Sequence, residues 1–355
     1  MFASYNEFMI FSKILTDWYS NNKRELPWRQ TTNPYYIWLS EIILQQTQVA
    51  QGLPYYETFL KEFPSIFHLA KAQESQVLKL WQGLGYYSRA RNLHATAKYI
   101  VSELNGDFPN TYQELLKLKG VGDYTASAIA SICYNEPTAV VDGNVYRVLS
   151  RYFGIDTPIN SSAGAKEFKL LAQKLIDKNN PAEFNQAIME FGAVQCKPQN
   201  PNCHICPFQD SCLALKNNRI SELPVKIKAA KAKKKYFNFL VLISEDNKTV
   251  LEKRQEKGIW QNLYQFPLIE TEQEVNYETF NTLIKAHHLL KNIPFQLSLY
   301  NEEVIIHKLS HQHLYTKFWI VNMNSILRDG ISIHDVPNYA VPILIGNFIE
   351  GFNFR

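Results

Sequence analysis

Apolar residues recur at helical spacing through the first two thirds of the chain. Phe8, Phe11, Leu15 and Trp18 lie three to four positions apart, which places them on one face of an amphipathic helix. Comparable spacing continues to about Leu215, and no convincing alternation of apolar and polar residues competes with it. The pattern therefore predicts an all-α domain over residues 1–220.

The pattern changes beyond this domain. Residues 221–235 are rich in lysine and poor in large apolar side chains, which favours a solvated linker, with phosphate binding as the alternative. Short apolar runs then predict strands at Tyr236–Ile243, Thr249–Glu252, Val304–Lys308 and Tyr315–Val321, and helical spacing predicts helices at Thr279–Leu290 and Pro342–Phe348. Residues 236–355 are therefore expected to form an α+β domain, and the chain to be multi-domain.

Length and composition agree with two globular domains. The chain has 355 residues, of which 46% are hydrophobic and 20% charged. No apolar run approaches the roughly 18 residues of a membrane span, and the N-terminus lacks the basic and apolar segments of a signal peptide. We therefore expect a cytoplasmic monomer without membrane association. The net charge of +4 permits a polyanionic partner but does not require one.

Four of the five cysteines form a compact motif, C-x6-C-x2-C-x5-C, made of Cys196, Cys203, Cys206 and Cys212. In a reducing compartment, four soft thiolates this close suit a tetrahedral Zn²⁺ ion or an iron–sulfur cluster better than disulfides. The spacing is not that of a zinc ribbon, and ligation of a [4Fe–4S] cluster allows it. The motif predicts a metal site.

Residues 115–130 predict two helices joined by a turn in which Gly120 and Gly122 flank Val121. Both glycines can adopt positive φ and bring the backbone close to a ligand, and the following helix offers free N–H groups to a phosphate. We expect Val121 to point inward. The pattern is that of a helix–hairpin–helix, a clamp on a nucleic-acid backbone, and a simple tight turn between helices is the alternative.

Glu41 is the only charged residue in a predicted helix over residues 34–48. Its neighbours one turn away, including Ile37 and Leu44, should favour the protonated carboxylic acid, which makes Glu41 a candidate general acid. The alternative is a buried glutamate paired with an arginine such as Arg29.

Asp142 precedes a helical stretch that begins at Gly143, so it is a candidate helix N-cap. The N–H groups and the dipole of that helix would keep its carboxylate ionised. Glu41 and Asp142 are therefore expected to titrate apart. Cleavage of a glycosidic bond requires this division, because one group protonates the leaving group and the other offsets positive charge on the sugar.

Several motifs together carry a family resemblance. They are Leu26–Arg29, Ser40–Val49, Gly83–Ala90, Gly120–Gly122, Val141–Val145 and the four-cysteine loop, in that order. The chain resembles the adenine DNA glycosylases of the MutY family over most of residues 5–220. The resemblance implies base excision repair, in which adenine mispaired with 8-oxoguanine or guanine is flipped out of duplex DNA and its N-glycosidic bond is hydrolysed. It also implies a [4Fe–4S] cluster on the four cysteines.

The resemblance implies a role for each matching residue. Glu41 would protonate the adenine ring, Asp142 would stabilise the oxocarbenium sugar, and Tyr124 and Asn144 would support them. The implied DNA contacts are Arg29, Gln46, Thr47, Leu84, Tyr86, Gly120, Val121, Gly122 and Lys197. Of these, Gln46, Leu84 and Tyr86 would fill or wedge the base stack. Outside the family context, such apolar and aromatic positions are often core, and a surface lysine is usually solvated.

Tyr124 separates this chain from relatives that also cut the DNA strand. Those enzymes carry a lysine two residues after the second hairpin glycine, and a phenol cannot form the imine that such a lysine forms with the sugar. A monofunctional glycosylase is therefore expected. Two alternatives are a lyase that resembles endonuclease III, which Tyr124 disfavours, and a non-catalytic lesion binder, which the Glu41 and Asp142 pair disfavours.

The C-terminal part resembles the second domain of the same family, which is Nudix-like in fold. The match begins at Gly258–Pro267, and residues 268–277 lack the acidic Mg²⁺-binding motif of Nudix hydrolases. Recognition is thus the expected task. Leu309–Leu314 resembles the loop that detects 8-oxoguanine, with Ser310 and His311 as candidate hydrogen-bonding residues, and a polar hairpin turn is the alternative.

Overall fold

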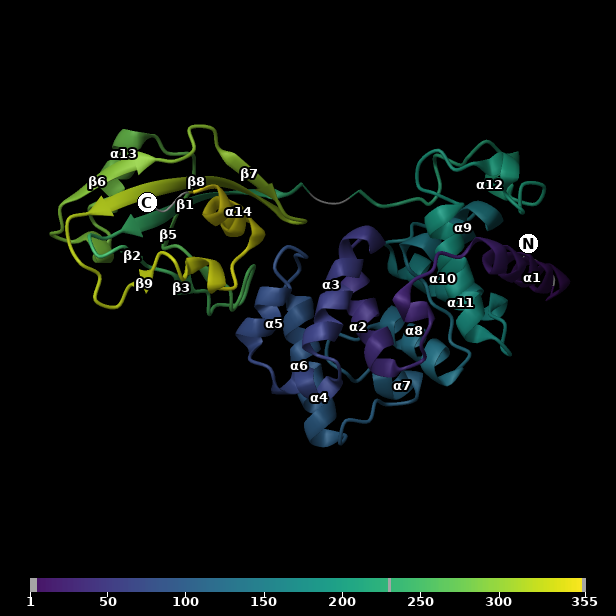
Figure 1. Cartoon of the computed structure of the whole chain (residues 1–355). Helices are drawn as coiled ribbons and strands as arrows, with labels where there is room; N and C mark the ends of the chain where they lie inside the picture. The colour runs from purple at the N-terminus through teal and green to yellow at the C-terminus, as the bar shows by residue number, and fades with distance from the viewer. Residues whose placement is uncertain (1–4, 229–230, 353–355) are drawn as a thin grey trace. The chain divides into compact units, whose positions relative to one another are not determined.

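The computed structural model describes residues 5–228 and 231–352, which fall into two compact units. Unit 1 consists of Met1–Lys71 and Asn92–Lys228, and unit 2 of Ala72–Arg91 and Ala229–Arg355 (Figure 1). Unit 2 thus includes a short segment from within the helical part of the sequence. Among the described residues, no helix has both the length and the apolar character to cross a membrane.

Unit 1 is helical, as the apolar spacing predicts. The helices before the hairpin are α1 (Tyr5–Asn22), η1 (Pro27–Arg29), α2 (Pro34–Leu44), α3 (Val49–Glu62), α4 (Ile66–Lys71) and α6 (Ser88–Glu103), whose first residues belong to unit 2. Those that follow are α7 (Tyr112–Leu115), α8 (Asp123–Tyr134), α9 (Gly143–Phe153), α10 (Ser162–Leu175), α11 (Pro181–Val194), η2 (Cys203–Ile205) and α12 (Leu213–Lys216).

A buried cluster joins the N-terminal helix to the segment that carries the cysteines. Phe11 and Leu15 of α1 are fully buried, and Phe191 of α11 belongs to the same cluster. The Phe11 ring stacks on that of Phe208, between the third and fourth cysteines, with centroids 4.9 Å apart. Burial of such aromatic side chains contributes roughly 2 kcal/mol each, so this packing fixes the cysteine loop on the helical core.

The glycine-bounded turn lies between α7 and α8. Gly120 has a φ of +80°, and a Cβ there would meet the Cβ of Asn92 at 2.7 Å, so only glycine fits. Val121 is buried, as predicted. Gly122 is the N-cap of α8 and has a φ of −95°, so the expected positive φ applies to Gly120 alone. A Cβ on Gly122 would have no neighbour within 4 Å, which leaves the backbone at the start of α8 accessible.

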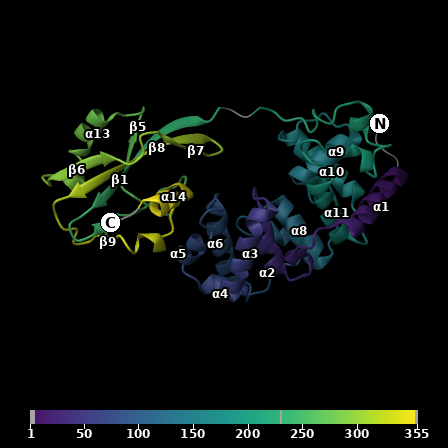
Figure 2. The same ribbon diagram turned by 45° about the horizontal axis from the view of Figure 1, so that its top comes forward.

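Unit 2 is built on a five-stranded mixed sheet in the order β5-β1-β8-β6, with β7 also paired to β8 (Figure 2). Its elements are α5 (Glu74–Leu80), β1 (Lys233–Ile243), β2 (Lys248–Thr249), β3 (Glu252–Lys253), β4 (Tyr264–Gln265), β5 (Leu268–Thr271), α13 (Tyr277–Ile284), η3 (His288–Leu290), β6 (Phe295–Leu299), β7 (Ile305–Lys308), β8 (Gln312–Met323), β9 (Ile331–Ser332), η4 (Val336–Asn338) and α14 (Ile343–Gly351). Strands β1 and β8 are parallel, and the other pairs in this sheet are antiparallel.

Helices α13 and α14 cover opposite faces of this sheet. Trp319 of β8 stacks on Phe280 of α13 with ring centroids 4.2 Å apart. The preceding residue, Phe318, stacks on Phe348 of α14 at the same separation. Because successive side chains of a strand point to opposite faces, the two helices must lie on different sides. The result is an α+β layer structure, as predicted.

The strand boundaries differ in detail from the sequence expectation. Strand β1 begins at Lys233, so three lysines of the expected linker are strand residues, because their backbone pairs with Gln312–Leu314 of β8. Strands β5 and β6 were not expected. Both are short, and their pairing with β1 and β8 depends on tertiary contacts that local patterns do not encode.

Candidate active site

A pocket of about 170 Å³ in unit 1 contains both candidate carboxylates. Its wall is formed mainly by η1, α2, α8, the start of α9 and α11, and Glu41, Tyr124, Asp142 and Asn144 all line it. The volume is below the roughly 300–1,000 Å³ of pockets for drug-sized ligands, and it suits a single planar base. The sequence-predicted catalytic residues are therefore brought together in one cavity.

Glu41 reaches this pocket from the middle of α2. Asn33 caps that helix by accepting a 2.9 Å hydrogen bond from the Tyr35 N–H, and Pro34 occupies the first turn, as predicted. The Glu41 side chain is only 8% exposed. Burial raises the pKa of Glu41 to about 7, the negative charge of Asp142 adds to this, and a hydrogen bond from Tyr124 opposes it. Near neutral pH, a large fraction of Glu41 is thus a proton donor.

Tyr124, in the first turn of α8, links Glu41 to the far wall of the pocket. Its hydroxyl hydrogen-bonds the Glu41 carboxylate and lies 3.2 Å from Sδ of Met189 on α11. Burial and the two nearby carboxylates raise the pKa of Tyr124 well above its usual range, so the phenol stays neutral and can donate. It therefore orients the Glu41 carboxyl without supplying an anion.

Asp142 is the N-cap of α9, as the sequence predicts. Its Oδ1 accepts hydrogen bonds of 2.9 Å and 2.8 Å from the N–H groups of Asn144 and Val145. Burial raises the pKa of Asp142 above its ordinary value, whereas these bonds, the Asn144 amide and the charge of Arg147 lower it. The capping groups thus favour the carboxylate as expected, but burial outweighs them, because the pocket removes the carboxylate from water.

Asn144 binds the second oxygen of Asp142, and Arg147 in turn binds Asn144. The Asn144 amide donates a 2.7 Å hydrogen bond to Oδ2, and its own Oδ1 accepts one of 2.8 Å from Arg147. Arg147 also donates to the carbonyl oxygens of Gly192 and Cys196, at 2.6 Å and 2.7 Å. The orientation of the Asp142 carboxylate is therefore fixed by a hydrogen-bonded chain that reaches the first residue of the cysteine loop.

Arg29 does not pair with Glu41. Its guanidinium donates a 2.7 Å hydrogen bond to Glu190 of α11, and Arg24 binds the same carboxylate with Nε and Nη2 at 2.7 Å each. Burial of Glu190 is outweighed by these two arginines, which lower its pKa to about 2. The alternative reading of Glu41 as an arginine-paired residue is thus wrong. Arg29, which was expected to contact DNA, lies in the pocket wall.

The sequence reasoning missed the contribution of α11 to the pocket. Gln186, Met189, Glu190 and Ala193 all line the cavity. They are spaced i, i+3, i+4 and i+7, so they share one face of the helix. The sequence signal for this face is a pair of polar residues, Gln186 and Glu190, at helical spacing on a helix that is otherwise largely buried.

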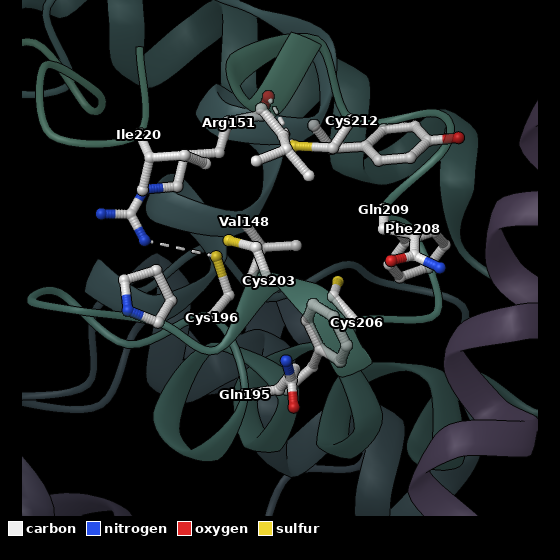
Figure 3. A pocket seen from close by; sticks show the side chains of 14 residues that line it. Val148, Arg151, Gln195, Cys196, Cys203, Cys206, Phe208, Gln209, Cys212 and Ile220 are labelled. Atoms are coloured by element: carbon white, nitrogen blue, oxygen red, sulfur yellow. Dashed lines mark hydrogen bonds between the residues drawn. The ribbon is translucent and has the colours of Figure 1, made fainter. Parts of the chain in front are cut away.

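The four cysteines surround one pocket at the end of unit 1 (Figure 3). Arg151 holds the loop: it donates to the carbonyl oxygens of Lys197 and Pro198 at 2.7 Å and 3.0 Å, and its Nη1 lies 3.5 Å from Sγ of Cys196. Among the described residues, no group of three His, Cys, Asp or Glu side chains could hold one metal ion. Four thiols spread around a shared cavity beside a buried cation fit a polynuclear iron–sulfur cluster.

The residues expected to contact DNA have different environments. Gly120 and Gly122 form the turn before α8, and Thr47 lines the active-site pocket. Gln46, with a φ of +55°, Tyr86 and Lys197 are exposed, Tyr86 to 53%. Leu84 is only 6% exposed, so Tyr86, rather than Leu84, is the accessible side chain of the Gly83–Ala90 segment.

Ser310 and His311 lie in the exposed turn between β7 and β8 of unit 2. Two backbone bonds shape this turn, from Leu309 N–H to the Gln312 carbonyl at 2.9 Å and from Lys233 N–H to the His311 carbonyl at 3.0 Å. The Ser310 and Tyr86 hydroxyls are 2.7 Å apart. Because both residues belong to unit 2, the candidate lesion-reading turn and the accessible tyrosine form one local surface.

The Ala72–Arg91 segment is tied to the rest of unit 2 by further hydrogen bonds. The Lys79 ammonium donates to the carbonyl oxygen of Pro337 at 2.6 Å, and Arg91 donates to that of Gln261 at 2.9 Å. The Asn262 amide donates to Glu74 at 2.7 Å. These contacts attach the segment to unit 2 rather than to the helices around it in sequence.

Three family models match the chain. Residues 39–178 match the HhH-GPD superfamily base excision DNA repair protein, residues 196–212 the iron–sulfur binding domain of endonuclease III, and residues 238–351 the NUDIX domain. Cys196 and Cys212 are the ends of the matched iron–sulfur segment, so the four cysteines bind a [4Fe–4S] cluster.

Solved structures share the helical fold. A structure of a thermostable thymine-DNA glycosylase is 28% identical and covers 60% of this chain and 98% of its own, with a TM-score of 0.56. A non-covalent endonuclease III–DNA complex is 22% identical and covers 61% of this chain and 99% of its own, with a TM-score of 0.54, and it supports the fold alone.

Curated relatives match most of the chain. An adenine DNA glycosylase of Buchnera aphidicola (subsp. Baizongia pistaciae) is 37% identical over 88% of this chain and 86% of its own length. The enzyme of Rattus norvegicus is 44% identical over 63% of this chain and 46% of its own length. These matches show that the chain belongs to the adenine DNA glycosylase family, hydrolases of N-glycosyl bonds in base excision repair.

Proposed function

We propose that this enzyme excises adenine paired with 8-oxoguanine or guanine in duplex DNA and leaves the strand uncut. The supporting observation is that Glu41 and Asp142, which have different surroundings, line one pocket of the size of a base. An adenine flipped from the duplex would occupy this pocket, with its sugar toward Asp142 and its ring toward Glu41.

The two carboxyl groups divide the reaction. Protonated Glu41 gives its proton to a ring nitrogen of adenine, so that the electron pair of the breaking C1′–N9 bond leaves with a neutral base. The Asp142 carboxylate stabilises the positive charge that develops on the sugar. Water then adds to C1′ and its proton returns to the Glu41 carboxylate. Burial, which raises the pKa of Glu41 to about 7, supports the first step.

The composition of the pocket supports a monofunctional reaction. In the part of the chain that the structure describes, the cationic side chains on its wall are Arg24 and Arg29, and no lysine lines it. Tyr124 stands where a strand-cutting relative would need an amine. Without an amine the sugar cannot form a Schiff base, so the abasic site is the product.

The lesion strand is read by the turn of unit 2 in this proposal. The Ser310 hydroxyl and the His311 imidazole are exposed, and the Tyr86 hydroxyl positions Ser310. Hydroxyl and imidazole groups can hydrogen-bond the extra N–H and carbonyl oxygen of 8-oxoguanine. The N-terminus of α8 and the Gly120–Gly122 turn would bind the DNA backbone of a duplex that one monomer engages.

One duplex with a single adenine opposite 8-oxoguanine tests the reaction class. We expect strand cleavage only after treatment with hot alkali, because hydrolysis leaves an intact abasic strand. Cleavage before alkali would indicate a lyase, and a gel shift without any cleavage would indicate a lesion binder. Either of these results would contradict the proposal.

A second test addresses lesion reading. The Ser310→Ala/His311→Ala variant is expected to lower the preference for adenine opposite 8-oxoguanine over adenine opposite guanine, measured as the ratio of single-turnover rates. Ser298→Ala/His288→Ala changes an exposed serine and histidine elsewhere in unit 2 and should leave the ratio unchanged. An unchanged ratio in the first variant would remove the assigned role of this turn.

A further inference from the structure

We propose that one face of the sheet in unit 2 carries a second DNA-backbone surface, a basic strip formed by Lys234, His313 and Lys308. The strip would bind phosphates of the strand whose damaged base is read at Ser310 and His311. The choice of DNA strand rests on the proposed function, because the turn that contains Ser310 and His311 identifies the DNA strand that lies beside the strip.

The strand register places these three residues in one row. Lys234 of β1 is opposite His313 of β8, and His313 is opposite Lys308 of β7. Residues opposite each other on neighbouring strands point to the same face. The row therefore crosses three adjacent strands, and the same three strands are seen side by side in Figures 1 and 2.

The next row on the same face is aromatic and apolar. Tyr236, Tyr315 and Ile306 are opposite one another in the same registers. The rings of Tyr236 and Tyr315 are 5.2 Å apart, and the ammonium of Lys234 lies 5.3 Å from the centre of the Tyr315 ring. A row of basic side chains beside an aromatic platform is the usual arrangement of a nucleic-acid surface, where the platform packs against sugars or bases.

Lys234 and Lys308 differ from two other lysines of the sheet, Lys235 of β1 and Lys317 of β8. Lys235 pairs with Glu270, and Lys317 lies 2.8 Å from Glu274 and donates to the Val275 carbonyl. Lys234 and Lys308 are exposed, and within residues 5–228 and 231–352 neither has an acidic side chain within 4 Å. Their charges are therefore available to an external anion, whereas those of Lys235 and Lys317 are compensated.

The face is open at the strip and covered further along. Trp319, six residues beyond His313 on the same face, stacks on Phe280 of α13. The strip lies at the other end of β8, next to the β7–β8 turn, where Ile306 is 47% exposed. Because α13 stops short of these rows, a duplex backbone can reach them without any rearrangement of the sheet.

The spacing suits a phosphodiester backbone. Neighbouring strands lie about 4.8 Å apart, so the backbones of Lys234 and Lys308, with one strand between them, are separated by roughly 10 Å. One DNA strand presents a charge every ~3.4 Å along the helix axis, and its phosphates lie further apart than this along the winding backbone, so a strip of this length can reach more than one phosphate of the same strand.

The strip and the candidate lesion-reading turn are parts of one rigid element. The turn connects β7 directly to β8, and the N–H of Lys233, which precedes Lys234, donates to the His311 carbonyl. Phosphates held by the strip would therefore fix the distance between the strand backbone and the side chains of Ser310 and His311. The strip contributes affinity and register, and the turn contributes discrimination.

Binding of full-length protein to DNA as a function of salt tests the strip. All variants carry Asp142→Asn to prevent turnover, and fluorescence anisotropy gives Kd on one duplex with adenine opposite 8-oxoguanine and on one undamaged duplex. The Lys234→Ala/Lys308→Ala variant should weaken binding to both duplexes by the same factor. The slope of log Kd against log salt concentration should fall by roughly 1.8, since each phosphate contact contributes ~0.9.

Two further variants make the result specific. Lys234→Arg/Lys308→Arg keeps both charges and should retain the slope. Lys285→Ala/Lys291→Ala removes two exposed lysines near the end of α13 and should leave the slope unchanged. If the strip variant changed the slope no more than this control, the inference would be overturned. The undamaged duplex gives this answer even if the turn proves not to read 8-oxoguanine, so the two proposals can fail separately.

Discussion

The Asn144 side chain binds Asp142 and Arg147 at once, through a 2.7 Å bond to Oδ2 of the aspartate and a 2.8 Å bond from the guanidinium. Arg147 in turn donates to the carbonyl oxygen of Cys196, the first residue of the iron–sulfur loop. The iron–sulfur loop and the Asp142 carboxylate are therefore joined by a chain of three hydrogen bonds.

Arg147→Lys should slow excision while leaving DNA binding nearly intact. Lysine keeps the charge but loses the planar fork that binds Asn144, Gly192 and Cys196 together. We expect single-turnover excision to fall roughly 10- to 100-fold, the range typical when a residue that orients a functional group is lost. Arg219→Lys, in an exposed pair with Asp156, is the matched control and should leave the rate unchanged. Equal rates in the two variants would contradict this role.

Gly192→Ala should lower both stability and rate. A Cβ at Gly192 would lie 2.6 Å from Cβ of Asn144 and 2.9 Å from its carbonyl oxygen, so α11 could not stay as close to the start of α9. Overpacking of this kind destabilises by about 1–3 kcal/mol, and here it also displaces the partner of Asp142. Thermal unfolding and single-turnover kinetics measure the two effects. A Cβ at Gly143 has no neighbour within 4 Å, so Gly143→Ala should unfold at the temperature of the parent enzyme.

Glu190→Gln should destabilise the fold in a pH-dependent way. Glu190 is 1% exposed and its pKa is lowered to about 2 by Arg24 and Arg29. A carboxylate whose pKa is lower in the folded state than in the unfolded state stabilises the fold at pH values above its unfolded pKa. This stabilisation is lost as the pH falls through the folded pKa. The variant should therefore lose about 3 kcal/mol at pH 7, and the difference should shrink between pH 4.5 and pH 2. Denaturant unfolding at several pH values measures it, and a constant difference would contradict the assignment.

Glu41→Gln should stabilise the fold at high pH, in contrast to Glu190→Gln. Because burial raises the pKa of Glu41 from 4.5 to about 7, the folded protein binds the extra proton, and stability falls as the pH rises through this window. Gln removes that penalty, so the variant should be more stable than the parent above pH 7, by up to about 3 kcal/mol, and equal to it below pH 4.5. A variant that unfolds more easily than the parent at pH 8 would show that the carboxylate form is stabilised instead.

Local sequence patterns predicted the structural features that depend on the spacing of neighbouring residues. The helix that carries Glu41, the N-cap role of Asp142 and the inward-pointing Val121 each follow from a few neighbouring residues. The parts that escaped prediction depend on tertiary pairing. Arg29, the alternative partner of Glu41, pairs with Glu190 instead. Strand β1 extends into the lysine-rich segment because β8 pairs with it, and Ala72–Arg91 joins unit 2 through bonds to residues far away in sequence.

The pH dependence of adenine release tests the central claim most directly. With enzyme in excess over a duplex that contains adenine opposite 8-oxoguanine, the single-turnover rate constant should fall as the pH rises through about 7, because the reactive form requires protonated Glu41. Glu41→Gln should be at least ~100-fold slower at pH 6 and lack this descending limb. A parent rate that stays level from pH 6 to pH 9, or an active Glu41→Gln enzyme, would contradict the account.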